Sequence, residues 1–296
     1  MNLDRLADWL GRKPEPSPDL AAALDELARM PATRPELAGP ARSLSRLLAT
    51  AFLNGGDAPP PGADPRSSGH GGRDGEPIFR ASPPTLSPRG LKARSLAILD
   101  TLLTDGPAAR PLREAVRRGV VDVSTWASDA LAGRPEGIAA WAEANGVDPD
   151  LAASVLRLTL LPSLSRITAG AGPSPIGRPG GACPWCCSAP LLGELRGLER
   201  EVRLRCGLCA GDWPGGRLSC PSCGEDDHRR LAVRHVEGEA DRCRVSVCET
   251  CGSRLKLVGT LARLSPPGLI VADLATVHLD LIDPAGPATS PAPPAP

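Results

Sequence analysis

The residues of this chain best suited to chemistry are its cysteines. All ten of them fall in one stretch of the 296-residue sequence, and eight form Cys-x-x-Cys pairs. The pairs are Cys183/Cys186, Cys206/Cys209, Cys220/Cys223 and Cys248/Cys251. Two thiolates three positions apart on a tight turn can face one metal ion, and a second such turn completes a tetrahedron of four sulfurs. Zinc and a single rubredoxin-type iron both accept this geometry, so four pairs predict two metal sites without naming the metal.

Two ways of grouping the pairs are open, sequential and nested. The spacers between successive pairs hold 19, 10 and 24 residues, and loop-closure entropy changes too slowly with length to choose between the groupings. We favour the sequential grouping because each long spacer contains the alternating strand pattern that a metal ribbon requires. The predicted ligands are Cys183, Cys186, Cys206 and Cys209 at site 1 and Cys220, Cys223, Cys248 and Cys251 at site 2.

Two cysteines and two histidines lie near the pairs without belonging to them. Cys187 follows its pair directly, where many metal knuckles have glycine, and we interpret it as an unused neighbour of Cys186. Cys243 alternates with apolar residues, which predicts a buried thiol. His228 and His235 could replace a cysteine, but the four pairs already supply all eight ligands.

Metal sites filled by four sulfurs are most often structural, because no coordination position remains for substrate or water. This argues against metal-assisted hydrolysis. Thioredoxin-like exchange is also disfavoured, since it uses one Cys-x-x-Cys at the start of a helix, and these pairs precede strands or turns. The sequence therefore predicts no catalytic residues and a protein that is not an enzyme.

Composition and charge narrow the class of protein further. The 34 basic and 34 acidic residues cancel, and there are two Phe and no Tyr, which weighs against nucleic-acid binding. No apolar run reaches the roughly 18 residues of a membrane span. Residues 1–12 lack the pattern of a secretory signal, so we expect a cytoplasmic protein whose cysteines bind metal instead of forming disulfides.

The elements around the cysteines predict an α+β fold with an all-helical N-terminal domain, two small rubredoxin-like or zinc-ribbon β modules and a C-terminal helix. Pro31 is expected to end the first helix, and Pro162 to kink or split the last one before the cysteines. A stripe of Ile270, Leu274, Val277 and Leu281 predicts one continuous amphipathic helix near the C-terminus.

These elements divide the chain into eight segments. We expect N-terminal helices in 1–54, a flexible Gly/Pro-rich excursion in 55–85, further helices in 86–170, a linker in 171–182, the first four-cysteine module in 183–214, the second in 215–260, the C-terminal helix in 261–283 and a disordered tail in 284–296.

The cysteine segments resemble those of the FdhE-type formate dehydrogenase accessory proteins. The resemblance is carried by Cys183-Pro-Trp-Cys186, by Arg205-Cys206-Gly-Leu-Cys209 with Trp213, by Arg217-Leu-Ser-Cys220-Pro-Ser-Cys223, by Cys248-Glu-Thr-Cys251 leading to Leu255-Lys256, and by a terminal segment from Val271 to Asp280. It is specific from about Cys183 to Asp283, whereas the N-terminal half shares helical character and length.

The resemblance implies a cytoplasmic, non-catalytic maturation factor that binds the catalytic subunit of a respiratory formate dehydrogenase before export and is needed for its activity. It also implies iron at the two cysteine sites. Trp213, Asp273 and Asp280 are the candidate partner contacts. The alternatives are a zinc-ribbon nucleic-acid-binding protein and a rubredoxin-type electron-transfer protein, and self-association stays open.

Overall fold

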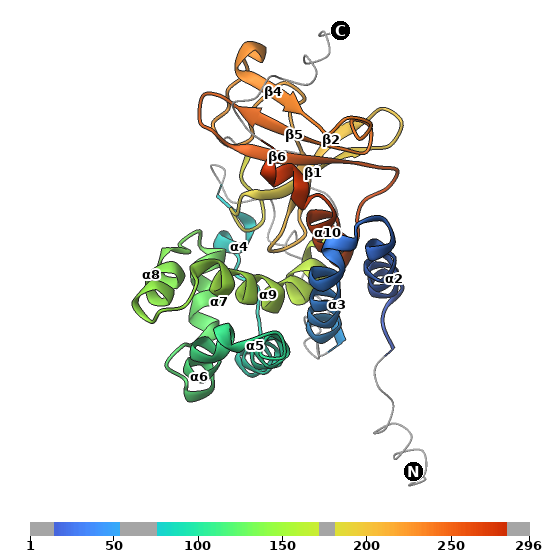
Figure 1. The fold of residues 1–296 in the computed structure, drawn as a ribbon. Helices are drawn as coiled ribbons and strands as arrows, with labels where there is room; N and C mark the ends of the chain where they lie inside the picture. The colour runs from blue at the N-terminus through green and yellow to red at the C-terminus, as the bar shows by residue number, and fades with distance from the viewer. Residues whose placement is uncertain (1–14, 54–75, 172–180, 283–296) are drawn as a thin grey trace, which may run out of the picture.

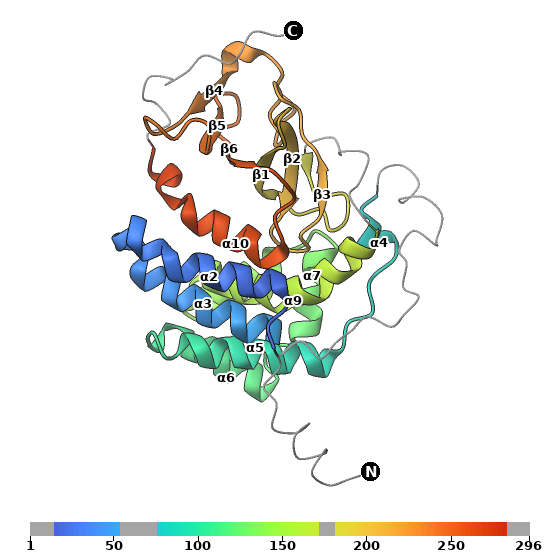
Figure 2. The ribbon, with the colours of Figure 1, turned by 90° about the vertical axis from the view of Figure 1, so that its right-hand side faces the viewer.

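The structure, a computed structural model, describes residues 15–53, 76–171 and 181–282 and has two layers. A layer of helices from the N-terminal half lies under a β-sheet from the C-terminal half, and helix α10 (Pro266–Ala275) lies between them (Figure 1). A view at right angles shows the same layering (Figure 2). The predicted α+β architecture is confirmed.

The helical layer is built from amphipathic helices with local start signals. Its α-helices are α2 (Pro18–Thr33), α3 (Ala38–Leu53), α5 (Pro88–Leu102), α6 (Arg110–Arg118), α7 (Val123–Leu131), α8 (Glu136–Ala144) and α9 (Pro149–Ala171), and short 3₁₀ turns occur at η1 (Pro35–Leu37) and η3 (Pro107–Ala109). The hydroxyl of Ser17 caps α2 and that of Ser87 caps α5, each followed by a proline at the first position. These signals explain why the starts of both helices are readable from the sequence.

The expected helix end at Pro31 and the expected split of the helix at Pro162 are both wrong. Helix α2 continues through Pro31 to Thr33, and α9 is one unbroken helix through Pro162. Burial of Met30 holds the last turn of α2 in place. In α9 the buried Arg94 donates a hydrogen bond to the carbonyl oxygen of Thr159, in the turn that the proline ring crowds. Tertiary packing thus outweighs the local cost of each proline.

The predicted flexible excursion is wrong for its last part. Helix α4 (Ile78–Ala81) forms there, and Phe79 is buried against Trp185 with ring centroids 5.7 Å apart. The backbone N–H groups of Ile78 and Phe79 donate to the carbonyls of Pro184 and Trp185. This segment is ordered by contacts with the first cysteine turn, which local composition does not reveal. Most of the predicted linker, the tail at 284–296 and residues 1–14 lie outside the described residues.

The sheet has six strands in the order β3-β2-β1-β6-β5-β4. They are β1 (Pro190–Arg196), β2 (Glu201–Cys206), β3 (Asp212–Pro214), β4 (Leu231–Arg234), β5 (Cys243–Cys248) and β6 (Arg254–Thr260), and the 3₁₀ turn η5 (His228–Arg230) precedes β4. Neighbouring strands are antiparallel except β1 and β6, which pair in parallel. The two predicted modules therefore share one continuous sheet.

Each half of the sheet repeats the same unit, in which a cysteine turn, a hairpin, a second cysteine turn and a third strand follow one another. In both halves the first cysteine of the second turn pairs with the start of the first strand, Cys206 with Pro190 and Cys248 with Leu231. Because β6 runs parallel to β1, the second unit continues the first in the same direction. The repeat positions both pairs of cysteine turns.

The expected C-terminal helix is only partly correct. Helix α10 ends at Ala275, and a 3₁₀ turn, η6 (Val277–Leu281), follows it. The apolar stripe breaks at this change of geometry, because Val277 is 37 % and Leu281 85 % exposed. Helix α10 still joins the layers, with Ile270 and Val271 in the core shared with the helices and Leu269 in a smaller core beneath β4, β5 and β6.

Candidate metal centres

The eight paired cysteines form two groups in the sequential arrangement. Sulfurs of Cys183 and Cys209 are 3.6 Å apart and those of Cys186 and Cys206 are 3.4 Å apart. In the second group, two sulfur pairs, Cys220 with Cys251 and Cys223 with Cys248, are each 3.7 Å apart. A tetrahedral zinc with bonds of about 2.3 Å separates its sulfurs by about 3.8 Å. Each group could therefore hold one metal ion.

The four cysteine turns share one backbone geometry. The first cysteine's carbonyl accepts from the residue after the second cysteine, at 2.8 to 3.0 Å. That residue has a left-handed backbone in every turn, with φ of 64° at Cys187, 55° at Ala210, 79° at Gly224 and 71° at Gly252. Backbone N–H groups of Leu208 and Ser222 point at the sulfurs of Cys206 and Cys220. The turns are thus interchangeable knuckles, and Cys187 occupies a glycine position.

Replacing Cys187 with glycine is expected to raise the free energy of unfolding by about 1 kcal/mol, because glycine adopts a left-handed backbone without the steric cost of a Cβ atom. Urea titration of the metal-loaded protein measures the change. Cys187→Ala keeps the Cβ atom and should leave the stability close to that of the wild type. An equal gain in both variants would show that the thiol, and not the backbone, is the source.

Site 1, the group of Cys183, Cys186, Cys206 and Cys209, is built into the main core of the protein. Its four cysteines are fully buried, and Trp185 and Trp213 pack beside them. The hydroxyl of Thr168, on α9, donates to the carbonyl of Cys209 at 2.8 Å. Helix α4 holds the other turn of this site through the backbone bonds described above. A metal here would link both sequence halves.

Gly211 closes one side of site 1. A Cβ atom at this position would lie 2.8 Å from Trp185, 3.1 Å from the sulfur of Cys183 and 3.2 Å from that of Cys209. We expect Gly211→Ala to lower the free energy of unfolding by about 1–3 kcal/mol through overpacking and to speed metal loss to a chelator. Gly39→Ala is the control, because nothing lies within 4 Å of that Cβ position. Normal metal retention in Gly211→Ala would contradict the assigned packing.

Site 2, the group of Cys220, Cys223, Cys248 and Cys251, is half exposed. Cys220 and Cys248 are buried, whereas Cys223 and Cys251 are exposed. The Ser253 hydroxyl lies 3.1 Å from the sulfurs of both Cys220 and Cys251. Among the described residues, no helix covers this site as α4 and α9 cover site 1 (Figure 1), and Cys223 and Cys251 are open to solvent.

Thiols with a lowered pKa occur in both groups, Cys186 in site 1 and Cys220 and Cys251 in site 2. Burial raises the pKa of Cys183 and of Cys209 well above the ordinary value, whereas hydrogen bonds from the three neighbouring cysteines lower that of Cys186. In site 2, burial alone would raise the pKa of Cys220, but the Ser253 hydroxyl and nearby backbone N–H groups lower it to about 6. Each group therefore offers a readily formed thiolate, the form that binds metal.

A buried ion network beside site 1 was not found by sequence reasoning. Glu194 on β1 and Arg205 on β2 form an ion pair in which both side chains are fully buried, and Glu194 also accepts from Arg196 and from the backbone of Leu264. Asp212 on β3 accepts from Arg203 at 2.8 Å and pairs with Arg196 at 2.9 Å. In the sequence, this network is indicated only by the alternation of acidic residues and arginines along these strands. The network fixes the register of β1, β2 and β3.

The pKa of Asp212 sets an acid dependence of stability. Burial would raise this pKa, but the hydrogen bond from Arg203 and the charges of Arg196 and Arg203 lower it overall. The folded pKa thus lies below the unfolded value of about 3.9, so the stabilisation is complete above that value and is lost as pH falls through the folded pKa.

We expect the stability difference between wild type and Asp212→Asn to shrink as the pH falls from about 5 to below 3. Urea midpoints of both proteins over this range measure the difference in stability. Any loss of metal at low pH affects both proteins equally and therefore cancels in the difference. A difference that stays constant with pH would contradict the role given to this carboxylate.

The other candidate residues have internal partners. Trp213 is fully buried, so its surface is not available to a partner in this conformation. Asp273 and Asp280 both contact the ammonium of Lys256, Asp273 at 2.5 Å and Asp280 at 3.0 Å. Cys243 is buried as expected, but it lies beside polar groups instead of a purely apolar surface. His228 and His235 are in neither four-cysteine group.

The fold and these groups define a class of protein in which a layer of helices packs against one β-sheet. That sheet is built from two repeated units, and each unit carries one four-cysteine group. No family model matches the sequence. Curated relatives do match, among them an FdhE homologue of Stutzerimonas stutzeri at 36 % identity over 108 residues, covering 34 % of this chain and 33 % of the relative. The FdhE protein of Escherichia coli is 31 % identical over 104 residues, covering 33 % of this chain and 31 % of the relative.

The matched segments thus span about a third of the length of these relatives. A solved structure extends the likeness in fold. The crystal structure of FdhE from Pseudomonas aeruginosa aligns with a TM-score of 0.56 and 24 % identity, covering 90 % of this chain and 91 % of that one. The chain is therefore similar to FdhE proteins in sequence over about a third of their length and to one of them in fold over 90 % of its own length.

Proposed function

We propose that this protein is a non-catalytic, metal-binding accessory protein that matures a respiratory formate dehydrogenase by binding its catalytic subunit. The observation that carries the proposal is the pair of four-cysteine groups at tetrahedral spacing in a chain that is similar to FdhE proteins. Both groups take one metal ion each, which we assign as iron by family resemblance, with zinc as the alternative. The client is bound in the cytoplasm before its export.

Closed sulfur shells support a role without catalysis. Four thiolates fill a tetrahedral site, so neither substrate nor water reaches the metal directly. Metal binding contributes to folding free energy, on the order of 10 kcal/mol in small zinc domains. The metals therefore act by ordering the sheet and the surface it presents. Among the residues described, none of the helices combines the length and apolar character needed to cross a membrane.

The surface we assign to the client is the end of α10 with the turn η6. Asp280 is 52 % exposed at its side chain, and the neighbouring Leu281 is 85 % exposed. An apolar side chain beside a carboxylate on a surface turn suits contact with a partner that offers a hydrophobic residue and a cation. Asp273 is less exposed and serves mainly to hold Lys256. Trp213 is fully buried on β3, so in this conformation it is not part of this surface.

Co-expression with the catalytic subunit of a formate dehydrogenase from the same organism tests the proposal. Affinity capture of this protein under anaerobic conditions should retain the subunit, and deletion of its gene should abolish formate oxidation in membranes. Complementation with a Cys206→Ser variant should fail if the metal-ordered sheet is required. No capture together with unchanged formate oxidation in the deletion strain would refute the proposed function.

The contact surface has its own variants. Leu281→Asp with Asp280→Asn should reduce capture of the subunit without changing metal content. Asp241→Asn is the matched control, because that carboxylate is fully exposed on a different turn. Equal capture by all variants would place the client elsewhere on the molecule.

A further inference from the structure

A third cluster of metal-binding side chains lies outside both four-cysteine groups. It joins Glu239 in the turn before β5, Cys243 at the start of β5 and His278 in η6. The sulfur of Cys243 lies 3.5 Å from Oε2 of Glu239 and 4.0 Å from Nε2 of His278, and these last two atoms are 2.8 Å apart. One sulfur, one nitrogen and one oxygen thus converge on one point.

We propose that Glu239, Cys243 and His278 form a third metal site that binds a divalent transition ion of the zinc class. Tetrahedral zinc bonds to these three atom types imply ligand separations of about 3.4–3.6 Å. One observed separation, 3.5 Å, lies within that range, and the other two, 2.8 Å and 4.0 Å, lie below and above it, so small side-chain rotations bring all three atoms to bonding distance. The mixed donor set suits borderline ions such as Zn²⁺ and Co²⁺.

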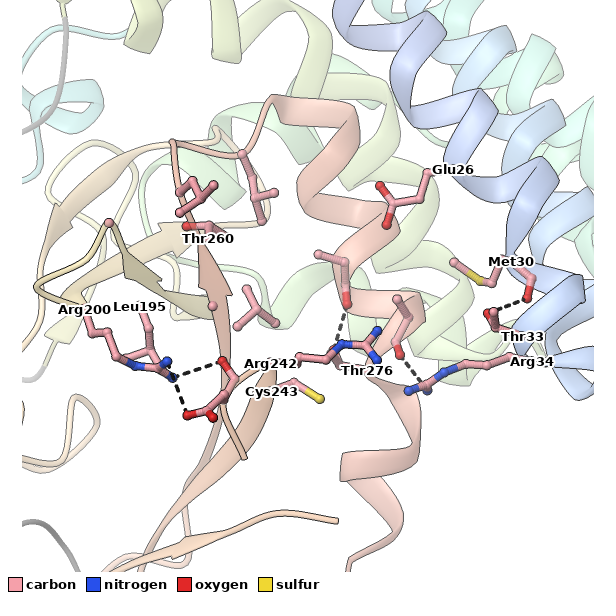
Figure 3. A pocket seen from close by; sticks show the side chains of 18 of the residues that line it. Glu26, Met30, Thr33, Arg34, Leu195, Arg200, Arg242, Cys243, Thr260 and Thr276 are labelled. Atoms are coloured by element: carbon pink, nitrogen blue, oxygen red, sulfur yellow. Dashed lines mark hydrogen bonds and ion pairs between the residues drawn. The ribbon is translucent and has the colours of Figure 1, made fainter. Parts of the chain in front are cut away.

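This site differs from the four-cysteine groups because it supplies only three protein ligands. Cys243 is part of the lining of a cleft of about 810 Å³ between the sheet, α10 and α2. Figure 3 shows Cys243 from the sheet and Arg34 from the end of α2 directed toward each other beside α10. The cleft provides an entry path and leaves the fourth coordination position for water or for an anionic ligand.

Arg34 decides whether the site is open. Its guanidinium donates to Nδ1 of His278, to Oε1 of Glu239 at 3.1 Å and to the carbonyl of Ala275 at 2.7 Å. A guanidinium only donates, so Nδ1 of His278 is the acceptor. Nε2 of His278 then carries the ring proton and donates a hydrogen bond to Oε2 of Glu239. In this arrangement the positively charged guanidinium of Arg34 takes the place that a metal ion would have beside Glu239 and His278.

Metal binding must reverse that tautomer. The thiol proton of Cys243 leaves to solvent, and Nε2 of His278 exchanges its proton for the metal while Nδ1 becomes protonated. Arg34 can no longer donate to Nδ1 and keeps its bond to Ala275. Arg34 therefore acts as a competitor of the metal, and its removal should raise metal affinity.

Metal stoichiometry tests the proposal. The full-length protein is made metal-free under anaerobic conditions, reloaded with Zn²⁺ or Co²⁺, freed of excess ion and analysed for metal per chain. We expect three equivalents for the wild type and two for Cys243→Ser. Cys187→Ser is the matched control, since it removes the other cysteine outside both groups and should still bind three. Two equivalents in the wild type, or three in Cys243→Ser, would overturn the proposal.

Two further variants guard against misfolding of Cys243→Ser. Glu239→Gln keeps the size of the side chain and should lose the third equivalent while circular dichroism stays that of the wild type. Arg34→Gln offers Nδ1 an acceptor and should tighten the third site roughly tenfold in competition with a chelator. Unchanged or weaker affinity in a folded Arg34→Gln would refute the competition. The third site and the maturation role fail separately, because two retained equivalents leave the proposed function intact.

Discussion

Replacing Cys206 with serine should destabilise the whole protein, whereas the same replacement at Cys251 should leave most of the fold intact. Each variant is expected to lose the ion of its own four-cysteine group. The free energy of unfolding should fall by about 4 kcal/mol or more for Cys206→Ser, a loss typical of a removed metal in a core. For Cys251→Ser we expect about 1–2 kcal/mol, because the affected unit can open locally.

The difference follows from the surroundings of the two sites. Cys206 is fully buried in the core shared with the helices, and Thr168 of α9 bonds to the same cysteine turn. Cys251 is exposed at the outer half of the sheet. For the same reason a chelator should remove metal from site 2 before site 1.

Metal analysis, urea titration and hydrogen exchange together check this prediction. Exchange in Cys251→Ser should rise in β4 and β5 while α9 stays protected, and in Cys206→Ser it should rise in α9 as well. Equal losses of stability in the two variants would contradict the assignment of site 1 to the main core.

Replacing Glu194 with glutamine is expected to lower the free energy of unfolding by about 3–5 kcal/mol, because it leaves the charge of Arg205 buried without its carboxylate. Both side chains of this pair are fully buried, and Glu194 also receives hydrogen bonds from Arg196 and Leu264. The neutral amide cannot replace these interactions. The loss should also loosen the pairing of β1 with β2.

Glu201→Gln provides the control on the same sheet. The Glu201 side chain is 62 % exposed and pairs with Arg203 at 3.3 Å, and such surface pairs contribute about 0–1 kcal/mol. Chemical denaturation of both variants in the metal-loaded state gives the comparison. Similar small losses in the two would show that solvent reaches Arg205 and that the network does not anchor the strands.

The cysteine turns and the hairpin strands were predictable because they depend on neighbours in the sequence. A Cys-x-x-Cys pair needs only one tight turn, and the alternation in Glu201–Cys206 and Cys243–Cys248 marks strands that lead directly into such turns. Helix starts at Ser17 and Ser87 are equally local. The strand pattern within the long spacers also favoured the sequential grouping that the structure shows.

Contacts between distant segments were not predictable. The parallel pairing of β1 with β6 joins residues about 60 positions apart, and no local pattern announces it. Phe79 becomes ordered only by packing on Trp185. Asp273 and Asp280 lie together because Lys256 binds both, and not because one helix continues through them.

The sequence by itself indicated two four-cysteine sites, the eight cysteines that could form them, most of the helices and the strands next to the cysteine turns, since each depends on short-range geometry. Only the tertiary structure decided that site 1 is enclosed and site 2 exposed, and that Glu239, Cys243 and His278 meet beside Arg34. These properties arise where the helical layer, the sheet and the C-terminal turn pack together. Burial and long-range contact are properties of the assembled layers, so they have no signature in the spacing of residues.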